Sequence, residues 1–315
     1  MNGEEAKERL RKAAFRTGFH AAGVAPAALP EVERERLLRW IEEGKHGTMG
    51  WMASRAEARV DPSFLLPGAR SMLMVALGYW PGNRPADPAD GMISIYARGR
   101  DYHKVMRAML RRLLAEAESI LPGVKGRPFV DSAPVLERAY AERAGIGWRG
   151  RNTNLIVPGA GSWFFLGGLV LDRELPPDEP AENRCGTCTA CVDACPTGAI
   201  GTDYRVDGSR CISYLTIEHA GAVSGELGER CGGWVFGCDI CQTVCPWNRF
   251  ARKTDAKDLL PRPEIAALDP GGALRLDRAR FERLFEGTAV RRAGWERFRE
   301  GALRAARNRE RGSES

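Results

Sequence analysis

Histidine is scarce in this sequence, and long apolar runs are absent. The 315 residues include only four histidines, at positions 20, 46, 103 and 219. Any metal site would therefore have to be built mainly from thiolates, which favours soft metals. The most apolar stretches, residues 71–80 and 162–171, have about half of the roughly 20 residues that a membrane helix requires. We expect both to be buried strands, and we expect no membrane segment.

The N-terminus lacks the apolar core of a signal peptide. It reads MNGEEAKERLRKAAF, which is charged almost from the start, and no twin arginine precedes an apolar segment. We therefore expect a cytoplasmic protein. Because thiols stay reduced in that compartment, the nine cysteines are predicted to be metal ligands or core residues rather than disulfides.

Lysine is also rare, since forty of the 47 basic residues are arginine. With 41 acidic residues, the formal net charge is +6. Residues 288–315 hold eight arginines against four glutamates, together with the aromatic pair Trp295 and Phe298. This end of the chain is predicted either to contact nucleic-acid phosphates or to form a solvated helix face, and composition leaves the choice open.

Apolar periodicity predicts a mixture of helices and strands before residue 172. Helices are expected over residues 4–16, 33–44, 101–121 and 133–144. Strands are expected over residues 71–80, 91–99 and 162–171, with a short one before Asp131. In the first helix, Leu10, Ala14 and Phe15 are predicted to form one buried stripe. Residues 154–158 and 162–172, separated by GAG, are predicted to pair as a hairpin.

Seven of the nine cysteines fall in two related runs. Residues 185–196 read CGTCTACVDACP, and residues 238–246 read CDICQTVCP. The first has the spacing C-x2-C-x2-C-x3-C-P, in which three thiolates hold one [4Fe–4S] cube and the fourth holds a second cube. The second is the same run with one member missing. Zinc explains paired CxxC motifs but not the three-thiolate run, so we predict two iron–sulfur clusters.

The spacing also divides the ligands between the clusters. The first cluster is assigned to Cys185, Cys188, Cys191 and Cys245. The second is assigned to Cys195, Cys238, Cys241 and one further thiolate. Spacing leaves that last ligand open between Cys211 and Cys231. Two clusters form an electron relay, and residues 1–184 precede them, so we expect an electron-accepting site in the first domain.

Three regions follow from these patterns. Residues 173–183 are rich in proline and charge, which is typical of a linker. We predict an α+β fold with a mixed α/β catalytic domain over residues 1–174 and a ferredoxin-like domain with two [4Fe–4S] clusters over residues 175–252. A helical, arginine-rich region is expected over residues 253–315.

Seven segments in this order resemble the epoxyqueuosine reductase family, which completes queuosine biosynthesis. They are YARGRDYHKVM, VDSAPVLERAYAERAGIGWRGRNTNLI, GSWFFLGGLVLD, CGTCTACVDACPTGAI, RCISYLTIEH, FGCDICQTVCPWN and GTAVRRAGWERFREGAL. The resemblance implies a cobalamin-binding first domain related to reductive dehalogenases. It also implies a tRNA substrate that carries an epoxide at the anticodon wobble base, and an external electron donor such as flavodoxin or ferredoxin. A monomer is expected.

The resemblance further implies roles for particular residues. It makes Cys211 the last ligand of the second cluster and leaves Cys231 as a buried thiol. It makes Asp131 the proton donor. The implied cobalamin contacts are Arg59, Arg138, Arg149, Gly150, Arg151, Asn152, Ser213 and Asp239. The resemblance also implies a base-off cofactor. DYHKVM (101–106) has methionine where a D-x-H-x-x-G motif needs glycine, so it is not predicted to be a cobalt-ligand motif.

Several of these residues have simpler interpretations. Asp131 precedes Ser132 and Pro134, where an aspartate would cap a helix. Tyr102 and His103 could face the site or simply pack. Two other functions stay open: a reductive dehalogenase-like cobalamin enzyme, and a ferredoxin-type electron carrier whose first domain is a docking module.

Overall fold

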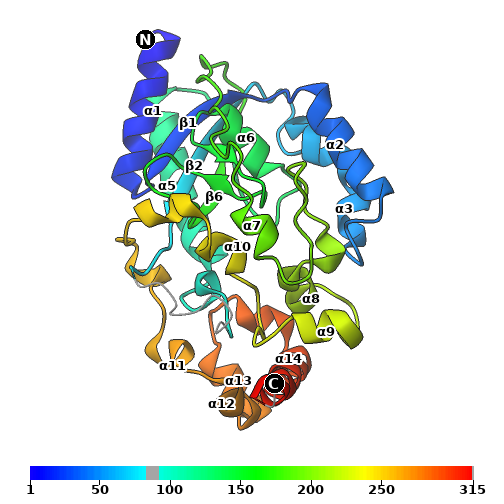
Figure 1. Ribbon diagram of the computed structural model, residues 1–315. Helices are drawn as coiled ribbons and strands as arrows, with labels where there is room; N and C mark the ends of the chain where they lie inside the picture. The colour runs from blue at the N-terminus through cyan, green and yellow to red at the C-terminus, as the bar shows by residue number, and fades with distance from the viewer. Residues whose placement is uncertain (83–91, 314–315) are drawn as a thin grey trace.

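A four-stranded antiparallel sheet forms the centre of the first 171 residues (Figure 1). The computed structural model describes residues 1–82 and 92–313. The strands are β1 (Ala21–Pro26), β2 (Ser71–Gly78), β3 (Gly126–Val130) and β6 (Phe164–Leu171), in the order β1-β2-β6-β3. This order makes β1 and β3 the edge strands. All neighbouring strands are antiparallel. The strands expected around β2, β3 and β6 are confirmed.

The helices fall into three sets along the chain. The first set lies on or beside the sheet: α1 (Gly3–Thr17), α2 (Glu31–Glu42), α3 (Gly50–Ser54), α4 (Ala56–Val60), α5 (Tyr102–Ile120) and α6 (Glu137–Arg143). The second set belongs to the cysteine-rich region: α7 (Ala190–Asp193), α8 (Ile212–Ile217), α9 (Gly225–Arg230) and α10 (Ile240–Thr243). The third set follows it: α11 (Pro263–Ala266), α12 (Pro270–Leu274), α13 (Arg278–Leu284) and α14 (Trp295–Ser313).

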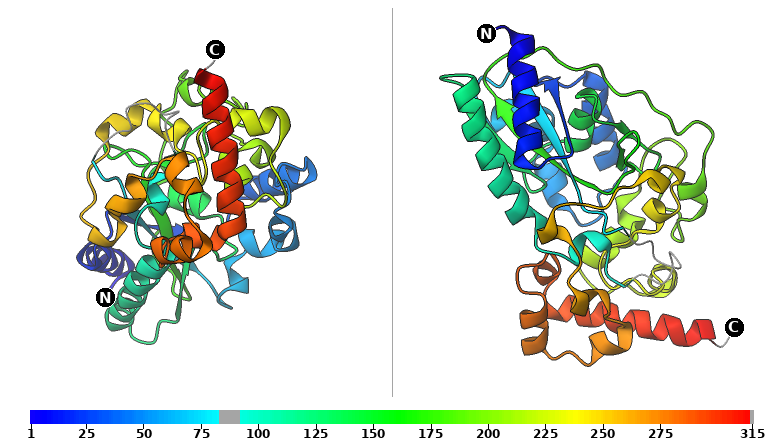
Figure 2. Two further views of the ribbon diagram at one scale, coloured as in Figure 1. Left: turned by 90° about the horizontal axis from the view of Figure 1, so that it is seen from below. Right: turned by 90° about the vertical axis from the view of Figure 1, so that its left-hand side faces the viewer.

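Helices cover both faces of the sheet. α1 and α5 lie side by side on one face (Figure 2), and α6 packs on the other. Successive side chains of a strand point to opposite faces, and β2 shows the result. Leu73 and Val75 pack in the core with α1 and α5, whereas Met72 and Met74 pack with Tyr140 of α6. This fully buried strand therefore needs a helical layer on each side.

The third set of helices builds a separate aromatic core against the cysteine-rich region. Phe281, Phe285 and Phe298 pack together with Val235 and Phe236. Phe298 is only 1% exposed, so the aromatic pair at residues 295 and 298 is not the surface feature that the sequence suggested. An amphipathic helix buries its apolar stripe, and Phe298 belongs to the buried stripe of α14.

One predicted strand is wrong. Residues 91–99, whose first residue lies outside the described part of the chain, make a single bridge between Ile93 and Phe236. Residues Ile95–Ala97 form a 3-10 helix. The Asp239 carboxylate accepts a hydrogen bond from the backbone N–H of Ile95 at 2.8 Å. Ile95 joins the core of the sheet domain. Ile93 and Ala97 pack in the other core, with Phe236 and the third set of helices, so the alternation reflects a segment that lies between two cores.

The predicted hairpin is also wrong. The short strand β5 (Leu155–Ile156) pairs with β4 (Trp148–Arg149) and not with β6. The GAG between the two apolar segments does form a tight turn, where Val157 bridges to Gly161. The segment after this turn enters the large sheet, where β6 pairs with β2 and β3.

Two details of the predicted helices change. The helix expected from Ala133 begins at Glu137, because the residue before Pro134 is disfavoured in helical conformation. In α1, Leu10 and Ala14 are buried as expected, but Phe15 is 46% exposed. Phe15 lies about 100° around the helix from Ala14, and it therefore falls outside the buried stripe.

No helix in the described ranges is both long enough and apolar enough to cross a lipid bilayer. The shortness of the apolar runs was also the reason why the sequence predicted no membrane segment. The longest helices of the fold, α5 and α14, each present one apolar stripe to a core and a charged side to solvent. They are therefore helices of a packed globular chain.

Candidate active site

The first group of cysteines assembles around α7. Burial raises the pKa of Cys191 to about 11, and the neighbouring thiols of Cys245, Cys185 and Cys188 add to the rise. These four residues are the set that spacing assigned to the first cluster. Cys245 follows α10, and α10 packs against α7. The contact between the two short helices therefore brings the distant fourth thiol to the loop that carries the other three.

The second group lies beside the first. Burial raises the pKa of Cys241, and the thiols of Cys211, Cys191 and Cys195 act in the same direction. The pKa of Cys238 is raised by burial and then by Cys241 and Cys211. The structure thus places Cys211 among the other three thiols assigned to the second cluster. The influence of Cys191 on Cys241 shows that the two groups are neighbours, as a relay requires.

Cys231 occupies a different environment. It is fully buried and packs in an apolar cluster with Ile212, Tyr214 and Trp234. Burial is the main cause of its raised pKa, and Cys211 is the one thiol that adds to it. Cys211, by contrast, also interacts with Cys195. The geometry therefore favours Cys211 over Cys231 as the eighth ligand.

Two buried tryptophans supply a test of whether iron–sulfur clusters fit these groups. The indole nitrogens Nε1 of Trp148 and Trp234 are buried and have no hydrogen-bond partner among the described residues. Trp148 packs with Cys245, and Cys185 packs against the same cluster. Trp234 packs where Cys211 and Cys238 do.

Buried N–H groups nearly always have an acceptor, and hydrogen bonds to cluster sulfurs are a normal feature of iron–sulfur sites. Four buried thiolates would also repel one another without a cationic group between them. Each cysteine group thus offers four thiolates as ligands, would be stabilised by a cationic centre between them, and has an unused N–H donor nearby. The residues present fit two clusters.

A carboxylate–imidazole–carboxylate chain stands at the end of β3. His103 Nε2 lies 2.8 Å from Oδ2 of Asp131, and its Nδ1 lies 2.8 Å from Oδ1 of Asp101. Asp131 has a φ of 42°, a left-handed conformation that is uncommon for residues other than glycine. Its side chain is 50% exposed, whereas that of His103 is 14% exposed. The carboxylate is therefore held by the histidine while one side of it stays open.

The alternative in which Asp131 caps a helix is wrong. α6 starts at Glu137, and the residue before it, Leu136, makes no side-chain cap. The choice for Tyr102 and His103 is also resolved. The His103 ring faces Asp131, whereas Tyr102 stacks between His103 and Phe165, with ring centroids 4.1 Å from each. The tyrosine thus packs against the imidazole, and its hydroxyl also faces the site, where it interacts with the Asp131 carboxylate.

The charges of this chain place the proton on the histidine. Burial alone would lower the pKa of His103, but the hydrogen bonds that its ring donates to Asp101 and Asp131, and the charges of these carboxylates, raise it to about 9. Burial would raise the pKa of Asp131, but the hydrogen bond and charge of His103, with help from Tyr102 and Arg292, bring it below its usual range. Near neutral pH, a charged imidazole therefore stands behind an ionised carboxylate.

A second polar pair lies next to Asp131. Arg59 is 8% exposed and stacks over the Trp51 ring at 5.1 Å. Its Nε and the Oε1 of Glu137 are both buried without a partner among the described residues. Burial raises the pKa of Glu137 to about 8, and the charge of Asp131 adds to the rise. A buried donor and a buried acceptor are thus free for a ligand that carries both functions, as the amide-rimmed ring of a corrinoid does.

The RGRN segment, residues 149–152, connects the sheet domain to the cysteine loops. The Arg149 guanidinium is held by Glu33 at 2.6 and 2.7 Å and by Glu142 at 2.7 Å. Arg151 donates to the carbonyls of Cys188 at 3.0 Å and Gly186 at 2.9 Å. Both side chains are thus engaged by the protein itself, so any contact of these two residues with a cofactor would come from their backbone.

The remaining predicted contacts come from four different segments. A Cβ on Gly150 would stand 2.7 Å from the Ile156 side chain, so a larger residue here would require that side chain to shift. The Asn152 amide donates to the Cys241 carbonyl at 3.2 Å. Asp239 is 2% exposed and accepts a hydrogen bond from Ser94.

Two more of the predicted cofactor contacts, Ser213 and Arg138, are less buried. Ser213 lies on α8, two residues after Cys211, and is half-buried. Arg138 is exposed and makes one long contact, to Thr153 Oγ1 at 3.5 Å. Sequence reasoning missed Asp101 and Glu137 as members of the site. The D-x-H spacing of residues 101–103 was the signal for the first, but Glu137 gave none, because its burial depends on the fold.

Comparisons with known proteins follow this geometry. The family model described as "Epoxyqueuosine reductase QueG, DUF1730" matches residues 59–132, and that described as "4Fe-4S double cluster binding domain" matches residues 184–248. The second match confirms the prediction of two [4Fe–4S] clusters. The assignment of particular cysteines to each cluster stays a prediction, which the two groups support.

Whole-chain relatives agree. A curated epoxyqueuosine reductase of Xanthomonas campestris pv. campestris is 44% identical over 302 residues, which cover 93% of this chain and 84% of the relative. An epoxyqueuosine reductase of Vibrio cholerae is 41% identical over 313 residues, which cover 98% of this chain and 85% of the relative. A crystal structure of an epoxyqueuosine reductase with an epoxyqueuosine-modified tRNA-Tyr stem loop matches with a TM-score of 0.87 at 30% identity, covering 99% of this chain and 84% of that one.

Proposed function

Because this chain belongs to the epoxyqueuosine reductase family, we propose that it reduces epoxyqueuosine to queuosine at the wobble position of tRNA. It is an oxidoreductase. The observation that carries the proposal is the charged His103 held behind the half-exposed Asp131 carboxylate, in a chain that also groups eight thiols for two clusters. A related enzyme, similar over nearly the whole chain, has been solved with an epoxyqueuosine-modified stem loop.

The reaction requires two electrons and two protons. The three-membered ring loses its oxygen as water, both carbon–oxygen bonds break, and a carbon–carbon double bond forms. The electrons reach the site through the two [4Fe–4S] clusters, and the protons go to the departing oxygen. The chain must therefore pass electrons inward from the cysteine-rich region and present an acid on the substrate side.

Asp131 is the residue that presents the acid. An alkoxide forms as the first carbon–oxygen bond breaks, and protonating it at that moment removes a large charge penalty. His103 Nε2 holds the proton that Asp131 relays, and Asp101 keeps the imidazole charged. Since half of the Asp131 side chain is exposed, the carboxylate can reach a substrate on one side while it accepts a proton from His103 on the other.

The site also fits a base-off cobalamin. When bound, this cofactor supplies a cobalt centre that delivers electrons to the substrate carbon. Arg59 offers the unused buried donor and Glu137 the unused buried acceptor. Arg138 offers an exposed cation, and residues 150–152 offer a tight backbone loop. Ser213 and Asp239 are the contacts proposed from the cysteine-rich region. His103 is not proposed as a cobalt ligand, because both of its ring nitrogens are engaged by carboxylates.

The remaining parts of the proposal concern partners and place. The proposed electron donor is an external carrier such as flavodoxin or ferredoxin, which would pass electrons to the two clusters. The protein works as a monomer in the cytoplasm. The eight proposed cluster ligands all come from one chain, which supports the monomer.

Anaerobic reconstitution tests the proposed function. The purified chain is loaded with iron, sulfide and cobalamin and checked by its visible spectrum. It is then incubated with a chemical reductant and epoxyqueuosine tRNA, and the nucleosides are analysed by mass spectrometry. Queuosine should appear only when both cofactors are present. A loaded chain that reduces an electron acceptor but forms no queuosine would instead be a carrier, and the proposal would be wrong.

A further inference from the structure

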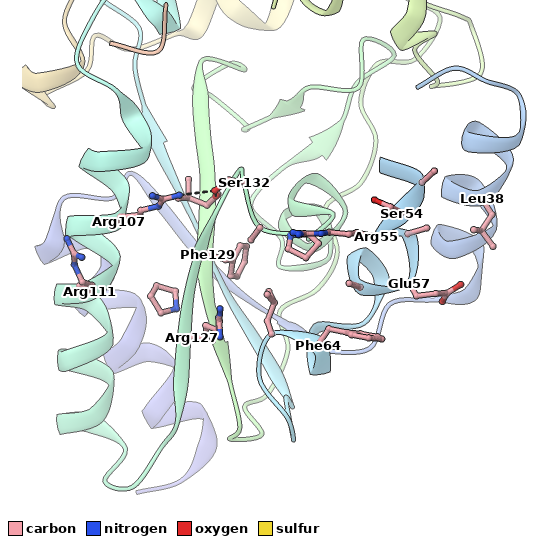
Figure 3. A pocket seen from close by; sticks show the side chains of 18 residues that line it. Leu38, Ser54, Arg55, Glu57, Phe64, Arg107, Arg111, Arg127, Phe129 and Ser132 are labelled. Carbon is pink, nitrogen blue, oxygen red and sulfur yellow. Dashed lines mark hydrogen bonds between the residues drawn. The ribbon is translucent and has the colours of Figure 1, made fainter. Parts of the chain in front are cut away.

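A groove of about 990 Å³ runs beside the free edge of β3 (Figure 3). Its walls come from α5 on one side and from residues 53–58 with Phe64 on the other, and Phe129 lies on its floor. Among the described residues, β3 pairs with β6 alone, so the groove follows a strand edge whose outward backbone groups have no described strand beside them. Asp101, His103 and Asp131 do not line this groove.

Four arginines line this groove. Arg107 and Arg111 project from α5, Arg127 projects from β3, and Arg55 projects from the opposite wall (Figure 3). All four are exposed. Within the described residues, Arg55, Arg111 and Arg127 have no side-chain hydrogen bond or ion pair. A group of unpaired like charges around one concavity is costly unless an anion occupies it.

The carboxylate that lines the groove does not neutralise these charges. Glu57 is bound by Arg34 at 2.8 and 3.2 Å, and this pair lies on the α2 side. Of the four groove arginines, only Arg107 has a partner, and that partner is the neutral hydroxyl of Ser132 at 2.8 Å. The groove therefore presents an excess of positive charge to solvent.

The groove also presents an aromatic surface. Phe64 lines it and is 66% exposed, more than any other large apolar side chain among the described residues. Arginines interleaved with an exposed aromatic ring are typical of surfaces that bind single-stranded nucleic acid, in which phosphates meet the cations and a base stacks on the ring. A peptide strand added to the β3 edge would not require the four cations.

The groove begins at the candidate acid. Ser132, which receives the Arg107 hydrogen bond, directly follows Asp131. On α5, His103, Arg107 and Arg111 occupy successive turns, because they are spaced by four residues. A chain that places one nucleotide at Asp131 therefore meets Arg107 next and Arg111 about 6 Å further along, a step comparable with that between successive phosphates.

We propose that this β3 groove binds the sugar–phosphate backbone of the nucleotides that flank the modified wobble nucleotide, with a flanking base stacked on Phe64. The inference rests on the proposed function for the identity of the RNA. The residues that carry it, Arg55, Arg107, Arg111, Arg127 and Phe64, belong neither to the predicted cofactor contacts nor to the arginine-rich C-terminal region.

The test is a binding measurement on the reconstituted protein. The double variant Arg111→Glu/Arg127→Glu is compared with the matched control Arg112→Glu/Arg173→Glu, which makes the same change of charge at exposed arginines outside the groove. The probe is a fluorescein-labelled anticodon stem loop, with and without epoxyqueuosine. The groove variant should bind at least tenfold more weakly, and the slope of log affinity against log salt should fall by about 1 to 2. Phe64→Ala should weaken binding at unchanged salt slope.

The same samples separate this inference from its alternatives. If the groove variant binds the stem loop like the control, the inference is overturned. It is equally overturned if the variant keeps its RNA affinity but no longer takes up cobalamin, because the groove then holds the phosphate of the cofactor. If the wild-type chain binds the stem loop through the groove yet forms no queuosine, the groove stands and the proposed reaction fails.

Discussion

The imidazole of His103 lies 2.8 Å from the carboxylate of Asp131, and its raised pKa keeps it protonated near neutral pH. The two residues are far apart in sequence and meet because α5 packs beside β3. An aspartate that must act as an acid near neutral pH has two solutions: a raised pKa of its own, or a partner that holds the proton for it. This site has the second arrangement, and four predictions follow from it and from the cysteine groups.

Replacing Asp131 by asparagine should abolish turnover without loss of cofactors. The amide has the size of the carboxylate but cannot relay a proton, so the rate of queuosine formation should fall by about 100-fold or more. Single-turnover mass spectrometry of the tRNA nucleosides measures the rate, and the visible spectrum measures cobalamin and cluster content. Undiminished turnover in a fully loaded Asp131→Asn protein would remove the residue from the mechanism.

The pH dependence should report the protonation of His103. Its pKa of about 9 is raised above the ordinary value of 6.5, so the wild-type rate should hold through neutral pH and fall as pH rises through 9. Asp101→Asn removes one of the two carboxylates that raise this pKa, and the fall should therefore move to lower pH. His103→Gln should lose this limb of the profile and most of the rate.

A titration of the folded protein without cofactors gives an independent measurement. The His103 ring resonances should shift near pH 9 in the wild type and at lower pH in Asp101→Asn. Because the folded-state pKa is the higher one, the stability that these contacts contribute is fully present below pH 6.5 and is lost as pH rises through 9. An ordinary histidine pKa in the wild-type protein would contradict the arrangement.

The two candidate ligands of the second cluster should behave differently when replaced by alanine. Cys211→Ala should lose about half of the iron, because one of the two cubes loses a ligand. Cys231→Ala should keep all of it and be destabilised by about 1 kcal/mol, the usual effect of trimming a buried side chain. Iron analysis and electron paramagnetic resonance of the reduced proteins distinguish the two. The opposite pattern would exchange the roles of the two cysteines.

The unpartnered indoles should tune the clusters. Trp148→Phe and Trp234→Phe each remove an N–H that is positioned to donate to one cluster, and such hydrogen bonds help to set the reduction potential. Each variant should shift the potential of one cluster to a more negative value in a spectroelectrochemical titration. Trp163→Phe is the control, because its Nε1 is also unpartnered but it packs with Tyr79 and Trp80 in the sheet domain. Equal shifts in all three variants would refute the assignment.

The sequence predicted best what depends on short spacing. The cluster motifs are local, since a tight loop can hold three thiolates whatever surrounds it. The buried strands β2 and β6 were visible as apolar runs. The strand expected at residues 91–99 failed because its alternation has the same form whether the partner is a sheet or the cysteine-rich region.

The candidate site was only partly visible from sequence. Asp131 looked like a helix cap because its neighbours Ser132 and Pro134 are typical of a helix start, and only the position of α5 shows what its carboxylate binds. Arg149 and Arg151 were predicted only as cofactor contacts. Their partners include Glu33, Gly186 and Cys188, which are distant in the chain, so no local pattern could have identified those contacts.

The three hydrogen bonds of Arg151 have a consequence for how the molecule is assembled. Its guanidinium donates to the carbonyls of Gly186, Cys188 and Thr202, so a side chain from the first half of the chain acts as the template on which the first cysteine loop takes its shape. An excised cysteine-rich fragment would lack that template. We therefore expect the first cysteine loop to be less well ordered in such a fragment than in the whole chain.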